Sequence, residues 1–295
     1  MEPLVVALVI ASAFLHALWN AALKKQPDPE GASVAILAVA IAVAWAALPF
    51  AGGAVLPGLA GTGWSLAAGI CEGGYFVTLA LALRSAPLGT VYTVSRGGAL
   101  AAVWPVSALW FAEAISGRAA MGAAGVGLGL VLVGVDRRDR ASASGVLWAV
   151  ACAGFIAGYT LFYKAALAAG AEPTAVFAIA LAVALPVNLL RLGRGGVTRV
   201  QAALGVSPLV VMSAGVLCTA SFLLFLAALA RGGAGAAITL RNSSIVFTMV
   251  LAWLMGERPG PRQWVGTVAV VVGVVVLGWP CDGAGGLPPS PPRHA

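Results

Sequence analysis

Apolar residues run along this chain in long stretches that contain almost no charge. A helix that crosses a bilayer needs about 20 apolar residues in succession, and ten stretches of roughly that length are separated by charges or by Gly and Pro turns. They are Leu4–Leu23, Ala32–Phe50, Trp64–Leu83, Val91–Phe111, Ala119–Val135, Gly145–Tyr163, Thr174–Leu190, Leu209–Leu229, Gly235–Met255 and Gln263–Trp279. The pattern predicts an all-α polytopic membrane protein with ten transmembrane helices.

Composition supports a membrane location. Of the 295 residues, 61% are hydrophobic and 9% are charged, whereas a soluble domain carries about 25% charged residues. The first stretch follows Met1, Glu2 and Pro3 and ends at Lys24 and Lys25. Because a signal peptide has a basic region before its apolar part, we interpret this stretch as a retained helix. Residues 281–295, rich in Pro and Gly, are predicted to be a disordered tail.

Several function classes are excluded by what the chain lacks. The net charge of +7 resides mostly in connections such as Asp136–Arg140, and no soluble basic module is present that could bind nucleic acid. The four cysteines show no CxxC spacing, and there is no HExxH motif. We therefore expect no metal site, no cofactor and no enzymatic activity.

The two halves of the chain share residues in the same order. The matched pairs are Cys71/Cys218, Arg84/Arg231, Arg96/Arg241, Glu113/Glu257, Gly122/Gly266, Gly129/Gly273 and Gly134/Gly278. The glutamates lie 144 residues apart (257 − 113) and the arginines Arg96 and Arg241 lie 145 apart (241 − 96). Such order predicts two repeats, residues 1–138 and residues 139–280, each of five helices. Since five is odd, the second repeat enters the membrane inverted, which is typical of secondary transporters with a substrate site between the repeats.

Three segments resemble a known family. Ser12–Lys25, Phe111–Gly134 and Leu240–Gly278 are similar to the EamA-type drug/metabolite transporter superfamily, although Ala112–Ala114 reads Ala-Glu-Ala where that family has Gly-Glu-Arg. The resemblance implies ten spans and a central cavity lined by spans one, three and four of each half. It also implies a multi-pass protein of the cell (inner) membrane that exports or takes up a small metabolite or drug.

Polar side chains inside the apolar stretches are the candidates for substrate binding, because ionisable groups within a membrane are usually functional. They are His16, Trp19, Asn20, Glu72, Tyr75, Tyr92, Arg96, Tyr159, Tyr163, Arg241, Asn242 and Ser244. Other readings stay open for some of them. His16 and Asn20 could hydrogen-bond to a neighbouring helix, and Trp19 could belong to the interfacial aromatic belt.

The two arginines favour a substrate with negative charge. Arg96 lies five residues after Val91, or about 8 Å into the membrane at 1.5 Å per residue, and Arg241 lies at a similar depth. A guanidinium facing a water-filled cavity suits a carboxylate or phosphate group. Snorkelling toward the interface is the alternative. A pairing of either arginine with Glu72 is compatible with the cavity-facing role and with snorkelling.

Glu72 is the one acid deep within an apolar stretch. We consider it a candidate for proton coupling, with a fixed counter-ion or a ligand for a substrate amine as alternatives. Structural roles are expected for four other residues. Glu113 and Glu257 are expected at helix ends or between repeats, and Gly129 and Gly273 at close helix contacts. Lys164, at the end of a stretch, is expected to snorkel.

Together these observations favour a secondary transporter that works by alternating access on a small anionic or zwitterionic organic solute. The alternative is a lipid flippase or a translocase of lipid-linked intermediates. Expected partners are the solute, the lipid bilayer and protons, with the chain acting as a monomer or weak dimer. Eleven of the 17 Lys and Arg residues fall in the odd-numbered connections and four fall on the other side. That bias predicts cytoplasmic odd connections and external termini, whereas the family resemblance implies termini inside.

Overall fold

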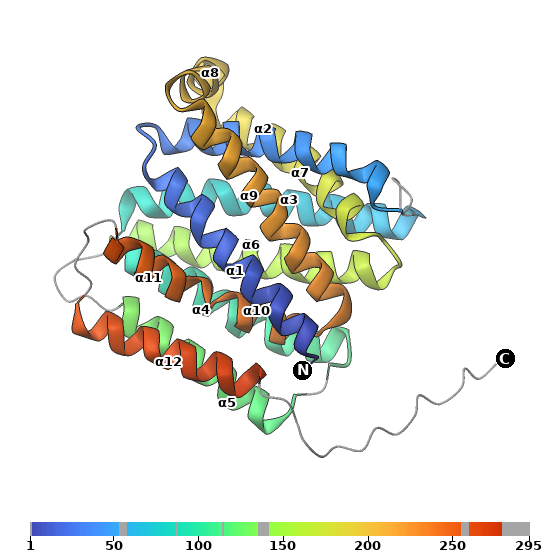
Figure 1. Cartoon of the computed structure of the whole chain (residues 1–295), viewed down its shortest axis with the longest axis vertical. Coiled ribbons are helices and arrows are strands. Elements are labelled where there is room, and N and C mark those ends of the chain that lie inside the picture. Colours follow the sequence, from blue (N-terminus) through green and yellow to red (C-terminus); the bar gives the residue numbers. More distant parts are fainter. Residues whose placement is uncertain are drawn as a thin grey trace.

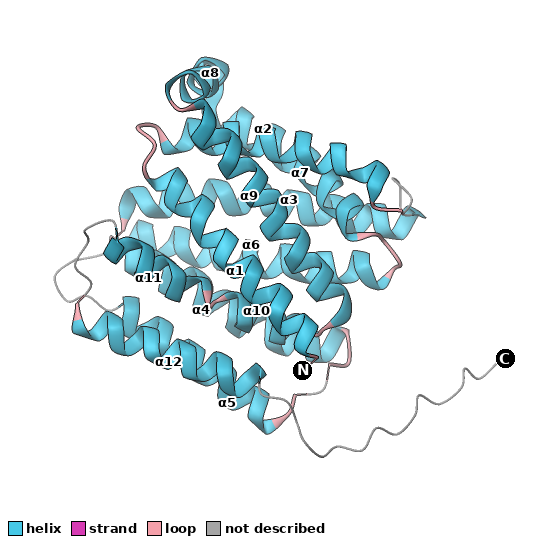
Figure 2. Ribbon diagram, viewed as in Figure 1, coloured by secondary structure: helices cyan, strands magenta, loops and turns pink. Residues whose placement is uncertain are grey.

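The structure, a computed structural model, describes residues 2–52, 58–86, 88–113, 115–134, 142–254 and 260–278. Within these ranges it consists of helices joined by short connections and contains no strand (Figures 1 and 2). The α-helices are α1 (Pro3–Lys24), α2 (Pro29–Ala47), α3 (Gly58–Ser85), α4 (Leu88–Trp110), α5 (Gly117–Gly134), α6 (Ala143–Ala168), α7 (Pro173–Leu192), α8 (Gly196–Val206), α9 (Pro208–Arg231), α10 (Ala234–Arg241), α11 (Ser244–Leu254) and α12 (Pro261–Gly278). Two short 3₁₀ turns, η1 (Leu48–Phe50) and η2 (Gly193–Gly195), follow α2 and α7.

Local sequence explains where several helices begin. Proline occupies the first turn of α1, α2, α7 and α9, where its fixed φ suits the helix and its missing N–H is not needed. Side chains cap other starts. Asp28 accepts from the N–H of Gly31 at 3.2 Å, and Glu172 accepts from the N–H of Ala175 at 3.0 Å. Each cap satisfies one of the N–H groups that a helix leaves unpaired at its start.

The described helices overlap all ten predicted apolar stretches, one of which is divided between α10 and α11. Seven helical segments in the described part of the chain are long and apolar enough to cross a membrane, and the apolar parts of α5 and α12 are shorter. The described residues are therefore all-helical with seven candidate membrane-spanning segments, while the number of ten crossings stays a prediction.

Two local features differ from the sequence prediction. Gly235–Met255 is not one helix, because α10 ends at Arg241 and α11 starts at Ser244. The intervening Asn242 and Ser243 are residue types that hydrogen-bond locally and favour turns. The second feature is α8, which falls in a stretch that the sequence marks only as a charged connection. It follows Gly193, whose φ of 68° is one that glycine adopts readily.

Packing pairs helices from the two halves of the chain. The helix α3 packs against α6 and α7, and α9 packs against α1 and α2. The helix α4 contacts α6 and α10. The pair α5 and α12 lies along one edge of the bundle (Figure 1). The bundle interior is therefore built from both halves.

Glycines allow α5 and α12 to approach closely. A Cβ atom added to Gly122 would lie 2.8 Å from the carbonyl oxygen of Gly273, and one added to Gly129 would lie 2.6 Å from that of Gly266. A Cβ on Gly273 would lie 2.6 Å from the nitrogen of Val126. No side chain fits at these distances, so the backbones themselves are in contact.

Candidate functional site

His16 on α1 lies between the two arginines singled out by the sequence. Its Nε2 atom is 2.8 Å from Nη2 of Arg96 on α4, and its Nδ1 atom is 3.4 Å from Nη2 of Arg241 on α10. All three helices contribute to the interior, and His16 is 3% exposed. The two arginines therefore converge on a histidine.

The chemistry of the imidazole ring decides which contact is a hydrogen bond. A guanidinium can only donate, and a neutral imidazole accepts through one nitrogen and donates through the other. The shorter contact assigns the acceptor role to Nε2, which accepts from Arg96. With this assignment the proton sits on Nδ1 and faces Arg241, so two donors lie side by side at this point.

Arg241 is buried, at 2% exposed. Its guanidinium carbon lies 4.5 Å from the ring centre of Phe222 and 4.1 Å from that of Phe225, both on α9. These distances are typical of cation–π contacts, which stabilise a desolvated arginine. Its Nε and Nη1 atoms have no hydrogen-bond partner among the described residues. The sequence signal that could have found the aromatic contacts is the spacing of Phe222 and Phe225, one helical turn apart.

Glu72 lies on α3 and is fully buried. The hydroxyl of Tyr163 on α6 donates a hydrogen bond to its Oε2 atom. Its Oε1 atom has no partner among the residues that the structure describes. One oxygen of this carboxyl group is thus held by the opposite half of the chain, and the other is left available to a ligand or proton.

Aromatic residues extend from this carboxyl group to His16. Tyr159 packs against both Tyr75 and Tyr163, with ring centres 5.8 Å and 5.7 Å apart. Trp19 packs edge-on against His16, with ring centres 5.2 Å apart. The Nε1 atom of Trp19 is a further buried donor with no partner in the described part of the chain.

The remaining predicted site residues are placed as follows. Asn20 donates to the carbonyl of His16 at 2.7 Å, a bond within α1. Asn242 and Ser244 are buried, and Nδ2 of Asn242 is without a partner among the described residues. The carbonyl of Ser244 accepts from the hydroxyl of Thr248 at 2.9 Å. The side chain of Tyr92 lies outside the described residues.

Glu113 and Lys164 lie at the junction of α9 and α10. The N–H groups of Ala234 and Gly235 donate to the Glu113 carboxylate at 2.8 Å and 3.4 Å. The Lys164 ammonium donates to the carbonyls of Leu229 at 2.9 Å and Gly232 at 2.7 Å. The sequence predicted that Lys164 snorkels, and it did not predict these two hydrogen bonds to backbone carbonyls. Glu257 lies outside the described residues.

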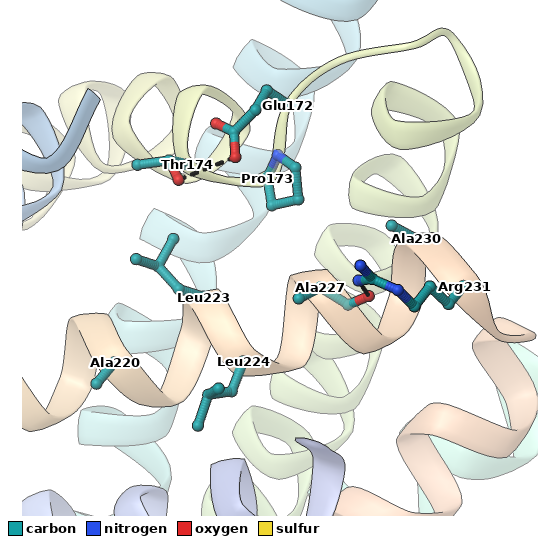
Figure 3. A pocket seen from close by; sticks show the side chains of 9 residues that line it. All are labelled: Glu172, Pro173, Thr174, Ala220, Leu223, Leu224, Ala227, Ala230 and Arg231. Atoms are coloured by element: carbon teal, nitrogen blue, oxygen red, sulfur yellow. Dashed lines mark hydrogen bonds between the residues drawn. The ribbon is translucent and has the colours of Figure 1, made fainter. Parts of the chain in front are cut away.

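A pocket on the side of the bundle is separate from this polar interior. It is lined by Glu172, Pro173 and Thr174 at the start of α7 and by one face of α9 (Figure 3). Figure 3 also shows Arg231 turned back along α9, where its Nη1 atom donates to the carbonyl of Ala227 at 2.9 Å. The lining is mostly Ala and Leu. None of the predicted substrate-binding residues lines it.

Comparison with known proteins supports the membrane interpretation. Residues 143–279 match the model of the EamA-like transporter family. A solved structure described as "Crystal structure of protein" matches with a TM-score of 0.68 and 21% sequence identity, covering 92% of this chain and 94% of its own. That likeness shows a shared fold. No curated protein matches the chain significantly. Over residues 143–279 the chain is therefore similar to the EamA-like transporter family.

Proposed function

We propose that this chain is a secondary transporter that moves a small organic anion across the cell (inner) membrane by alternating access. The EamA-like domain marks a membrane transporter of the drug/metabolite type. The proposal adds the charge of the solute, the position of its binding site and the mechanism. It is carried by one observation, the convergence of Arg96 and Arg241 on His16 in the buried interior.

A buried hydrogen-bond donor without a partner destabilises the fold, so its presence indicates that the donor has a function. Leaving a polar group without a partner costs about 1–3 kcal/mol, and more for a charged group. Arg241 has two such nitrogens, and Trp19 and Asn242 each add one. Glu72 Oε1 is an unpaired acceptor in the described interior. A carboxylate, phosphonate or phosphate group supplies the oxygens that these donors need.

The packing supports a site between two inverted repeats. Exchanging the halves at an offset of 144 turns the contact of Gly122 with Gly273 into the contact of Gly266 with Gly129, and both contacts are present. The packing of α3 on α6 and α7 likewise corresponds to that of α9 on α1 and α2. Arg96 and Arg241, also matched, reach His16 from the two halves. In this arrangement each half of the chain contributes one arginine that contacts His16.

We also propose that Glu72 couples transport to protons. Its single hydrogen bond joins α3 to Tyr163 on α6, and Oε1 remains unpaired among the described residues. A carboxyl group in such a place can take up a proton when the site faces one side and release it on the other. Flux in proteoliposomes with and without a pH gradient, for the wild type and Glu72→Gln, tests this. Gradient-independent flux of the wild type would contradict it.

Binding to the purified protein tests the anion proposal. The probes are methylphosphonate and acetate, with acetamide as the neutral counterpart of acetate, measured by thermal shift and calorimetry. We expect binding of the anions but not of acetamide. Arg96→Gln and Arg241→Gln should each weaken anion binding about 10- to 100-fold, since charged hydrogen bonds contribute roughly 1.5–3 kcal/mol.

Matched variants make this test specific. Arg241→Lys keeps the charge but loses the planar fork, so it should also weaken binding. Arg231→Gln is the control, because that arginine is exposed and bonds only its own helix in the described structure. Equal binding of acetate and acetamide, or unchanged binding in both glutamine variants, would disprove the proposal.

A further inference from the structure

The turn between α9 and α10 is held from both sides by charged groups. Lys164 donates to the carbonyls of Leu229 and Gly232 at the end of α9. Glu113 accepts from the N–H groups of Ala234 and Gly235 at the start of α10. We name this arrangement the α9–α10 clamp. Both charges also match the helix dipoles, since a cation suits the end of a helix and an anion suits its start.

Glu113 connects the two halves of the chain. It follows α4 of the first repeat, and it caps a helix 121 residues further on, in the second. The preceding residue, Ala112, has a φ of 51°, which for a residue with a Cβ costs about 1–2 kcal/mol. A strained backbone is retained where the surrounding structure imposes it. Here it places Glu113 against α10.

Below the clamp, α4 and α10 are joined by a second contact. The Trp104 indole N–H donates to the hydroxyl of Thr239 at 3.0 Å. Its ring also lies against Gly235, where an added Cβ would be 2.9 Å away. Arg241 is seven residues after Ala234, or about 10 Å along the helix. The clamp and the indole contact therefore close the bundle on one side of the two arginines.

At one of the offsets that relate the halves, the positions opposite to this contact are apolar. At the offset of 145 that relates Arg96 to Arg241, Trp104 corresponds to Met249 and Thr239 corresponds to Val94. Neither of these side chains can form a comparable hydrogen bond. At this offset, the hydrogen bond between Trp104 and Thr239 therefore has no counterpart in the other half.

We propose that the α9–α10 clamp is a gate, and that the solute reaches the arginines from this side only when α10 separates from Glu113. This inference rests on the proposed transport function, but not on the nature of the solute. Removing the clamp should then favour the state that is open on this side. The interior between Arg96 and Trp104 should become accessible, although neither Glu113 nor Lys164 lies in the anion site.

Cysteine labelling without any solute tests the gate. The background lacks Cys71, Cys152, Cys218 and Cys281, and the reporter is Leu100→Cys. Leu100 is 6% exposed and lies one turn from both Arg96 and Trp104 on α4. We expect Glu113→Ala to raise the rate of maleimide labelling about tenfold, which corresponds to the roughly 1.4 kcal/mol of a lost cap. Lys164→Met, which keeps the apolar stem, should act in the same direction.

Glu172→Ala is the matched control. Glu172 also caps a helix, but it accepts from the N–H of Ala175 only three residues away. Its loss should lower stability without changing the labelling rate. Unchanged labelling in both Glu113→Ala and Lys164→Met would overturn the gate, as would an equal rise in Glu172→Ala. If Glu113→Ala does not fold, Lys164→Met decides alone. If labelling rises but no anion binds to the protein, the gate is supported and only the proposal of an anionic solute is refuted.

Discussion

The Nε2 atom of His16 lies 2.8 Å from Nη2 of Arg96, across 80 residues of sequence. Because arginine only donates and this is the shorter of the two contacts, we assign this nitrogen as the acceptor of the ring. His16 therefore holds Arg96 in place and turns its own N–H toward Arg241. A single histidine orients one arginine and adds a donor beside the other.

His16→Ala should weaken binding of methylphosphonate about tenfold, because Arg96 loses its acceptor and the site loses a donor. His16→Gln should weaken it less, since an amide oxygen can still accept from Arg96. Calorimetry on the purified variants measures both. The control is His294→Ala, in the other histidine of the chain. Equal affinity for the alanine variant and the wild type would show that His16 does not position the arginines.

The sequence predicted the helices well and marked the two arginines within them, because both follow from local patterns. A long apolar stretch fixes a helix, and a charge inside it is conspicuous. The partners of these charges were not predictable, because they join residues far apart. The hydroxyl of Tyr163 reaches Glu72 across 91 residues, and Arg241 approaches His16 across 225. Helix α8 was missed because its short, mixed sequence has no long apolar run.

Tyr163→Phe should destabilise the protein by about 1–3 kcal/mol, because the buried Glu72 carboxyl loses its hydrogen bond. Thermal unfolding in detergent measures the change. Tyr159→Phe, which removes a neighbouring hydroxyl from the same helix, should cost less. Adding Glu72→Gln to Tyr163→Phe should cost less than the sum of the two single changes, because both remove one interaction. Additive costs would show that the bond contributes little.

The contact between α5 and α12 can be tested with two glycines on one helix. Gly129→Ala should lower the unfolding temperature, because its Cβ would lie 2.6 Å from the carbonyl oxygen of Gly266 and 2.6 Å from a methyl of Val270. At Gly127 an added Cβ meets nothing within 4 Å. Gly127→Ala should therefore leave the temperature unchanged or raise it, since alanine is favoured over glycine in helices by up to about 1 kcal/mol. The same sign for both variants would contradict the close approach.

Ala112→Gly tests the strain before Glu113. The φ of 51° at Ala112 is adopted by glycine without the steric cost that a Cβ brings. We expect the variant to be more stable by up to about 1 kcal/mol, the gain being limited by the greater freedom of glycine in the unfolded chain. Ala120→Gly, within α5, is the control and should be destabilising. A loss of stability at both positions would show that Ala112 is not strained.

The ion pair between Asp28 and Arg199 joins the start of α2 to α8, and its effect should depend on pH. The Asp28 carboxylate accepts from Nε and Nη2 of Arg199 at 2.7 Å and 2.6 Å. These hydrogen bonds hold the pKa of Asp28 below its ordinary value of 3.8. Because the folded pKa is the lower one, the stabilisation is present above the ordinary value and is lost as the pH falls through the folded value.

Asp28→Asn should therefore lower the free energy of unfolding at neutral pH and have a diminishing effect as the medium is acidified below pH 3.8. We expect a loss of up to about 1 kcal/mol, because both side chains are partly exposed and screened by solvent. Thermal unfolding of the wild type and the variant over a series of pH values measures the difference. Glu2→Gln, at the start of α1 where no side-chain cap bond forms, is the matched control for removing a carboxylate at a helix start. A difference between Asp28→Asn and wild type that grows on acidification would show that the ion pair does not stabilise the fold.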